Sequence, residues 1–306
     1  MSPRERRNFA ASVKQRLLNL AGERGEDFNF LLTRYGIERL LYRLSQSDHA
    51  GEFILKGAML FHLASKQVPH RATRDLDLLG KGAPDLPRLE NVFREIIRTR
   101  VDDDGLVFLD EGFRAERIRA EDEYAGVRLH VEARMAAARI PIQVDIGFGD
   151  APVPAPRKEV LAALLEFPAP RLLIYSWETV IAEKFQALAD LGMANSRMKD
   201  YFDLRHLSAT LPFDGDTLAR AIQATFERRR MPLPREVPTG LTKVFGDDPA
   251  KQVQWKAFLG KLRLDPLAMP LDRVVEQLRS FLMPPVEALI REQAFAKSWS
   301  PGGPWR

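Results

Sequence analysis

The middle of the chain has a two-residue hydrophobic period that most other segments lack. Apolar and polar residues alternate in "FRAERIRA", "GVRLHVEARM" and "IPIQVDIGFG", which lie between residues 106 and 148. Such alternation puts the apolar side chains on one face of a strand and the polar ones on the other. We therefore expect these segments to form an antiparallel meander.

Helical periodicity precedes this region. The segments "FAASVKQRLLNLA" and "FNFLLTRYGIERLLYRLS" repeat apolar residues every three or four positions. "EFILKGAMLFHLA" predicts a short strand, a turn at Gly57 and a helix. "RATRDLDLLG" then predicts a second strand, and "LPRLENVFREIIRT" an amphipathic helix with Asp85 as its cap.

The composition changes at "DAPVPAPRKEV", where closely spaced prolines predict a linker and a domain boundary near residue 150. Later segments are helical in period, and "AKSWSPGGPWR" is expected to be loosely ordered. The predicted fold class is α+β. N-terminal helices and a mixed-sheet core would occupy residues 1–150, and an all-α domain residues 151–306.

The overall composition is that of a globular protein, with 45% apolar and 29% charged residues in 306. No apolar segment is long enough to span a bilayer, and the N-terminus does not resemble a secretory signal. The absence of cysteine excludes disulfides and thiolate zinc sites. We expect a cytoplasmic protein without a membrane partner, and the net charge of +4 is compatible with a polyanionic one.

Two aspartates lie one residue apart in the second predicted strand. Asp75 and Asp77 would share a face, with Leu76 and Leu78 on the other. Two converging carboxylates repel each other unless a cation lies between them. The sequence leaves two interpretations open, a divalent metal site or a solvent-facing pair neutralised by nearby basic residues.

Two further features favour the metal site. Asp145 occupies a polar position in "PIQVDIGFGD", so a third carboxylate would join the pair, and Mg²⁺ prefers such hard oxygen ligands. Asp145 taken alone is equally well explained as an acid at a strand end. In "LKGAML", a glycine between strand and helix would allow the backbone to approach a phosphate closely.

These residues carry a resemblance. "LKGAML", "RATRDLDLL" and a later strand aspartate resemble the nucleotidyltransferase superfamily with a polymerase-beta-like core. "AEKFQAL" and "RMKDYFDL" further resemble the AbiEii/AbiGii toxin family, which includes the MenT-type toxins. The resemblance covers roughly residues 30 to 210.

The resemblance implies roles for individual residues, with Mg²⁺ as cofactor and an NTP as substrate. Asp75, Asp77 and Asp145 would be catalytic and bind the metal, with Asp145 acting either as a ligand or as a base. Lys184 and Asp200 would complete the catalytic set. The implied nucleotide-binding residues are Lys56, Gly57, Ala58, Arg74, Lys184, Asp200 and Asp203.

One position departs from the family pattern. Ala58 follows Gly57 where the family often has Ser, Thr or a second Gly, so any phosphate contact there must come from the main chain. Without the resemblance, Asp200 and Asp203 would be explained as ordinary surface charge on a helix.

The resemblance also implies transfer of a nucleotide to the 3' end of tRNA, which would inhibit translation, and neutralisation by a cognate antitoxin. The residues expected to contact RNA are basic: Arg71, Arg197, Arg228, Arg229 and Arg230. Two alternatives stay open, namely transfer to a small molecule or a protein hydroxyl, and a non-enzymatic nucleotide- or RNA-binding module.

Overall fold

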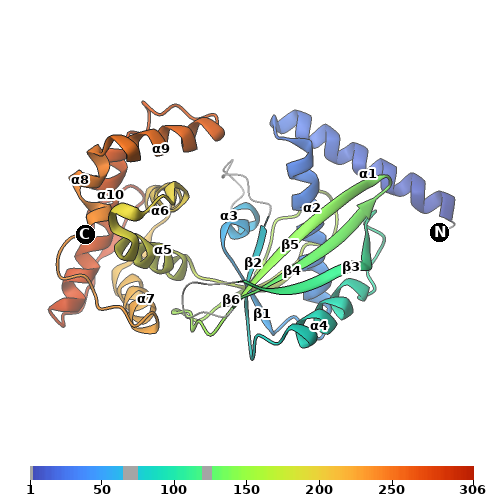
Figure 1. Ribbon diagram of the computed structural model, residues 1–306, viewed down its shortest axis with the longest axis horizontal. Coiled ribbons are helices and arrows are strands. Elements are labelled where there is room, and N and C mark those ends of the chain that lie inside the picture. Colours follow the sequence, from blue (N-terminus) through green and yellow to red (C-terminus); the bar gives the residue numbers. More distant parts are fainter. Residues whose placement is uncertain (1–2, 65–74, 119–125) are drawn as a thin grey trace. The chain divides into compact units, whose positions relative to one another are not determined.

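The computed structural model describes residues 3–64, 75–118 and 126–306. The chain forms two compact units (Figure 1). The first comprises Met1–Asp150 and Pro156–Ile174, and the second comprises Ala151–Ala155 and Tyr175–Arg306. None of the helices in the described residues is both long and apolar enough to cross a membrane.

The first unit is built around a mixed seven-stranded sheet with the strand order β3-β4-β5-β2-β1-β7-β6. Pairing is parallel between β5 and β2 and between β1 and β7, and antiparallel elsewhere. Its elements are α1 (Pro3–Arg24), α2 (Phe28–Gln46), β1 (Phe53–Lys56), α3 (Ala58–Ala64), β2 (Asp75–Gly80), α4 (Leu86–Arg98), β3 (Val107–Ile118), β4 (Gly126–Met135), β5 (Ala138–Phe148), β6 (Arg157–Val160) and β7 (Arg171–Ile174).

The predicted α+β class and mixed sheet are confirmed, and so are the N-terminal helices and the antiparallel meander. The expected cap of α4 is also present, since Asp85 Oδ1 accepts the Arg88 N–H at 2.8 Å. The sheet, however, continues beyond residue 150, because β7 pairs with β1 and carries β6. The sequence did not show these strands, since each has only four residues beside a proline-rich segment.

Helices α2 and α4 pack on the apolar side of the sheet, with α4 against β3 and α2 against β5 (Figure 1). Gly36 allows α2 to approach closely, because a methyl group there would lie 3.0 Å from the Ile140 side chain. Ile142 and Val144 are buried on this side of the sheet, whereas Gln143 and Asp145 are only half-buried. The polar side chains of β2 and β5 therefore occupy the opposite face.

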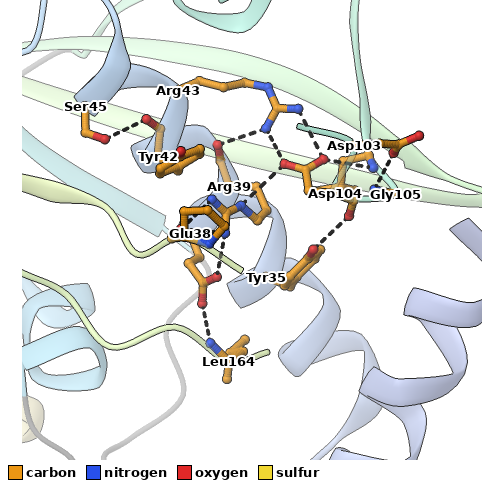
Figure 2. A network of polar contacts seen from close by, with 12 residues as sticks. Tyr35, Glu38, Arg39, Tyr42, Arg43, Ser45, Asp103, Asp104, Gly105 and Leu164 are labelled. Atoms are coloured by element: carbon orange, nitrogen blue, oxygen red, sulfur yellow. Dashed lines mark hydrogen bonds and ion pairs between the residues drawn. The ribbon is translucent and has the colours of Figure 1, made fainter. Parts of the chain in front are cut away.

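A buried polar network connects α2 to two irregular segments of the first unit (Figure 2). Arg43 donates to both oxygens of Asp104, at 2.6 and 3.2 Å. Arg39 donates to the Pro168 carbonyl, at 2.9 and 3.0 Å, and Glu38 accepts the Leu164 N–H at 2.7 Å. The network fixes the segment that leads into β7, and its buried groups are satisfied largely by one another.

The second unit is helical except for a two-stranded ribbon of β8 and β9. Gly192 follows α5 as its C-cap. The elements are α5 (Trp177–Leu191), the 3-10 helix η1 (Gly192–Ala194), α6 (Met198–Thr210), β8 (Phe213–Asp214), α7 (Gly215–Arg228), the 3-10 helix η2 (Thr239–Leu241), α8 (Lys243–Asp247), α9 (Pro249–Lys261), α10 (Leu271–Ile290) and β9 (Ser298–Trp299).

The expectation of a loosely ordered C-terminal tail is wrong. Trp299 is buried and its indole N–H donates to the Ser208 carbonyl at 2.7 Å. Trp305 stacks on Phe281 and donates to the Phe281 carbonyl at 2.9 Å. Gly and Pro in the tail suggested disorder, but the two tryptophans bury large apolar surfaces while satisfying their polar atoms.

Candidate active site

The polar face of the sheet holds the predicted acids of the first unit. Along β2, Asp75 is exposed and Asp77 half-buried, while Leu76 and Leu78 are buried on the other side. This alternation is what a strand with one apolar face requires.

The neighbouring strand adds the third acid. In the parallel register of β2 and β5, Asp77 lies opposite Asp145, and Asp75 lies opposite Gln143. Residues opposite each other in a register share a face, so three carboxylates occupy one face of two adjacent strands. The structure thus places the acids predicted as metal ligands on one face of the sheet.

Gly57 shapes this region in a way that the sequence did not predict. Its φ is +71°, and a methyl group on its Cα would overlap the carboxylate and Cβ of Asp77. The glycine therefore makes room for the Asp77 side chain, whereas the sequence suggested only space for a phosphate. Ala58, at the start of α3, is buried.

Lys56 lies in the same row of the sheet, opposite Asp77. Its Nζ is 3.2 Å from Asp150 Oδ2, just beyond the end of β5. The side chain is 17% exposed, so the predicted nucleotide-binding lysine is held at the edge of the acidic group.

Asp145 is bound by two neighbouring side chains. Arg128 on β4 donates from Nε to Oδ1 at 2.8 Å and from Nη2 to Oδ2 at 2.9 Å. Gln143 Nε2 lies 3.2 and 3.1 Å from the same two oxygens. The hydrogen bond to Asp145 is the main reason why the pKa of Arg128 is raised above its ordinary value.

The donor set can be tested against a divalent cation. Asp75 and Asp77 offer hard carboxylate oxygens on a face that solvent reaches, which fits such an ion. Within the described residues, no three His, Cys, Asp or Glu side chains are grouped closely enough to hold a metal ion. The acids therefore fit the ion in type, and the third of them is engaged with Arg128.

A pocket of about 260 Å³ opens beside Asp75. Its lining includes polar side chains from β4 and β5, namely His130, Glu132 and Gln143, and the apolar residues Pro141 and Ile142. The pocket provides space next to the exposed member of the aspartate pair for a group larger than water.

The second unit holds a separate cluster of predicted residues, between α5 and α6. Lys184 Nζ lies 2.6 Å from Asp200 Oδ1 and 2.8 Å from Asp203 Oδ2. Both aspartates are fully buried, and 14% of the Lys184 side chain is exposed. Arg197 precedes α6 and its Nε lies 2.8 Å from Asp200 Oδ2.

The charges of this cluster balance one another. Burial alone would lower the pKa of Lys184, but the charges of Asp203 and Asp200 outweigh it and raise the pKa. Lys184 is therefore held as an ammonium ion. The interpretation of Asp200 and Asp203 as ordinary surface charge is wrong, because neither side chain reaches solvent.

Comparison with known protein families assigns the chain to a family. Residues 39–288 match the family described as nucleotidyl transferase AbiEii toxin of a type IV toxin-antitoxin system. The chain belongs to the AbiEii family. Membership makes it a nucleotidyltransferase-type toxin and implies an antitoxin partner.

Two solved structures from Helicobacter pylori resemble this AbiEii chain. The crystal structure of JHP933 is 18% identical, with a TM-score of 0.44, covering 83% of this chain and 90% of the other. A second, described provisionally as a nucleotidyltransferase, is 19% identical, with a TM-score of 0.46, covering 86% and 97%. No curated protein matches the chain.

The remaining predicted residues of the AbiEii chain are all arginines. Arg71 and Arg74 lie outside the described residues. Arg228 ends α7, and Arg229 and Arg230 follow it directly; Arg228 and Arg230 are exposed.

Sequence reasoning missed Arg128 and Gln143. Both occupy polar positions in predicted strands, but their proximity to Asp145 depends on strand register, which alternation alone does not specify. The sequence nevertheless indicated such a pair, because an arginine on the polar face of one meander strand can pair with an aspartate on the polar face of the next.

Proposed function

We propose that this AbiEii-family chain transfers a nucleotide from an NTP to the 3' end of tRNA and thereby inhibits translation. The observation that carries the proposal is the acidic face of β2 and β5, where Asp75, Asp77 and Asp145 lie together. Grouped carboxylates serve nucleotidyl transfer by binding a divalent cation, which acts on the phosphates of the NTP.

The reaction joins an acceptor hydroxyl oxygen to the α-phosphorus of the NTP and breaks the bond to pyrophosphate. Asp75 and Asp77 would hold Mg²⁺, and Gly57 leaves the space that Asp77 needs. A bound divalent ion would stabilise the negative charge that develops on the phosphates. Asp145 is proposed as a ligand or as the base for the acceptor proton.

Two features support an RNA acceptor. The pocket beside Asp75 offers space for the reacting end of the acceptor. The exposed basic residues Arg228 and Arg230 offer phosphate contacts. Lys184, Asp200 and Asp203 keep their proposed part in nucleotide binding.

The test is incubation of the full chain with total tRNA, Mg²⁺ and each α-labelled NTP separately, followed by a denaturing gel. We expect one NTP to label tRNA. Asp77→Asn should reduce the rate at least about a thousandfold, which corresponds to about 4 kcal/mol of transition-state stabilisation. Asp110→Asn, which alters an exposed carboxylate of β3 paired with Arg98, should retain full activity.

Three results would contradict the proposal in different ways. Labelling that persists in Asp77→Asn would remove the acidic face from the reaction. NTP binding without labelled tRNA would point to a small-molecule or protein acceptor. Failure to bind any NTP would favour a structural role for the acids.

A further inference from the structure

Arg128 occupies a central position on the acidic face. It lies on β4 directly opposite Asp145, which in turn lies opposite Asp77 on β2. Its guanidinium faces Asp145 with two parallel hydrogen bonds, a geometry that is among the strongest an arginine forms. One third of the Arg128 side chain is exposed, so it can move without disturbing the core.

The contacts of Asp145 leave little capacity for another ligand. A carboxylate has about four lone-pair positions. Arg128 and Gln143 each reach both oxygens. A cation that used Asp145 as a ligand would have to replace at least part of this set.

We propose that Arg128 is an internal counter-ion that competes with the divalent cation for Asp145. This inference rests on the proposed function, because it concerns the same acidic face. Arginine does not lose its charge in proteins, so the competition depends on the cation and not on deprotonation of the arginine.

A second carboxylate is available to the displaced guanidinium. Glu116 on β3 lies opposite Arg128, on the side away from Asp145. Glu116 also contacts His130 Nε2 at 3.0 Å, and the charges of Asp145, Asp75 and Glu116 all contribute to the raised pKa of Arg128. Arg128 thus lies between two carboxylates of its row and can exchange one for the other.

The alternative explanation for the Arg128–Asp145 contact is that it is an ordinary cross-strand ion pair. Strands β4 and β5 contain a second arginine–carboxylate pair with which it can be compared. Arg139 on β5 binds both oxygens of Glu132 on β4, at 3.0 and 2.5 Å. The Arg139 side chain is 70% exposed, and Pro141 lies opposite Glu132. Arg139 is therefore a control with the same charge and the same paired geometry, and it lies further along β5 and does not contact Asp145.

The experiment measures Mn²⁺ affinity by electron paramagnetic resonance on the full chain, without nucleotide. We expect Arg128→Gln to raise the affinity about tenfold, the effect of removing a charge a few ångströms away together with its hold on Asp145. Arg139→Gln should stay within about twofold of the unaltered chain. Arg128→Lys, which keeps the charge but cannot form the two parallel bonds, should give a smaller rise and also serves if Arg128→Gln does not fold.

A double-mutant comparison separates competition for Asp145 from simple electrostatic repulsion between the Arg128 charge and the cation. In an Asp145→Asn background, Arg128→Gln should no longer raise the affinity, because the shared carboxylate has been removed. An equal rise in that background would overturn the proposal, as would an unchanged affinity or no Mn²⁺ binding in Arg128→Gln.

The transfer assay distinguishes this inference from the proposed function. Label transfer to tRNA together with an unchanged Mn²⁺ affinity in Arg128→Gln would refute the competition alone. A raised affinity that depends on Asp145, without any transfer to tRNA, would support the competition and refute the tRNA acceptor.

Discussion

The two groups of charged residues use the same side-chain types in opposite surroundings. On the sheet face, Asp145 is 20% exposed and Arg128 33% exposed. Between α5 and α6, Asp200 and Asp203 do not reach solvent at all, and Lys184 lies between them. Burial makes an unpaired charge costly, whereas water can replace a lost partner at the surface.

This difference indicates different tolerance to change. In the cluster between α5 and α6, an unbalanced charge would be buried and would destabilise the second unit. The sheet face contains three acids that solvent can reach or nearly reach, so a partner there can be exchanged at small cost to stability. A face of that kind suits the binding and release of a charged ligand.

The largest effect should follow removal of the buried cation. Lys184→Met leaves Asp200 and Asp203 without their shared ammonium, and we expect a loss of about 3 to 5 kcal/mol in the free energy of unfolding. Urea denaturation followed by circular dichroism measures it. The control is Arg128→Met, which should cost less than about 1 kcal/mol because its pair is partly exposed. Similar losses in both variants would remove the distinction between the two groups.

A smaller effect is expected at Glu38, a buried acid of the first unit. Burial raises the pKa of Glu38 to about 7 from 4.5, although the Leu164 N–H and Arg39 act in the opposite direction. The folded state therefore binds the proton more tightly than the unfolded state. This contribution to stability is fully present below about pH 4.5 and is lost as the pH rises through 7.

Glu38→Gln should remove this pH dependence. Between pH 5.5 and 8 the unaltered chain should lose about 2 kcal/mol that the variant retains, as measured from urea midpoints at the two pH values. The control is Glu90→Gln, which alters a partly buried carboxylate on α4 that accepts the Ala115 N–H. This variant should show the same dependence of the free energy of unfolding on pH as the unaltered chain. If the free energy of unfolding changed equally with pH in Glu38→Gln and in the unaltered chain, Glu38 would be ionised over the whole pH range measured.

The addition of a single methyl group tests how firmly the sheet face positions one acid. Gly57→Ala places a methyl group where the Asp77 side chain lies and also requires a positive φ at alanine. We expect a loss of about 1 to 3 kcal/mol in stability, with displacement of Asp77 and reduced Mn²⁺ affinity. Gly51→Ala, where nothing lies within 4 Å, should change stability by less than about 0.5 kcal/mol. Equal effects would mean that Asp77 has room to adjust.

Sequence patterns were informative where local chemistry determines structure. The alternation around Asp145 and the cap at Asp85 gave the strands and helix that are observed. Features that depend on pairing between distant segments were missed. β7 is a strand because it pairs with β1 and β6, and Arg128 reaches Asp145 only in one register of β4 and β5.

The candidate site shows the same division. Its acids were found because Asp75 and Asp77 share one face of a predicted strand, because Asp145 was expected on another strand, and because the motifs resemble a family. The burial of Asp200 and Asp203 was not expected from sequence, since a polar helix position does not reveal what packs over it. The tail was misjudged for the same reason, as the partners of Trp299 and Trp305 are distant in sequence.

The pairing of β7 with β1 has a consequence for dividing the chain. A fragment that ended at residue 150 would lack β7 and leave one edge of β1 unpaired. An apolar strand edge of that kind is a template for association with other chains, so the fragment would be prone to aggregation. The segment 156–174 therefore protects the first unit from self-association, although it follows that unit's first 150 residues and is separated from them by residues of the second.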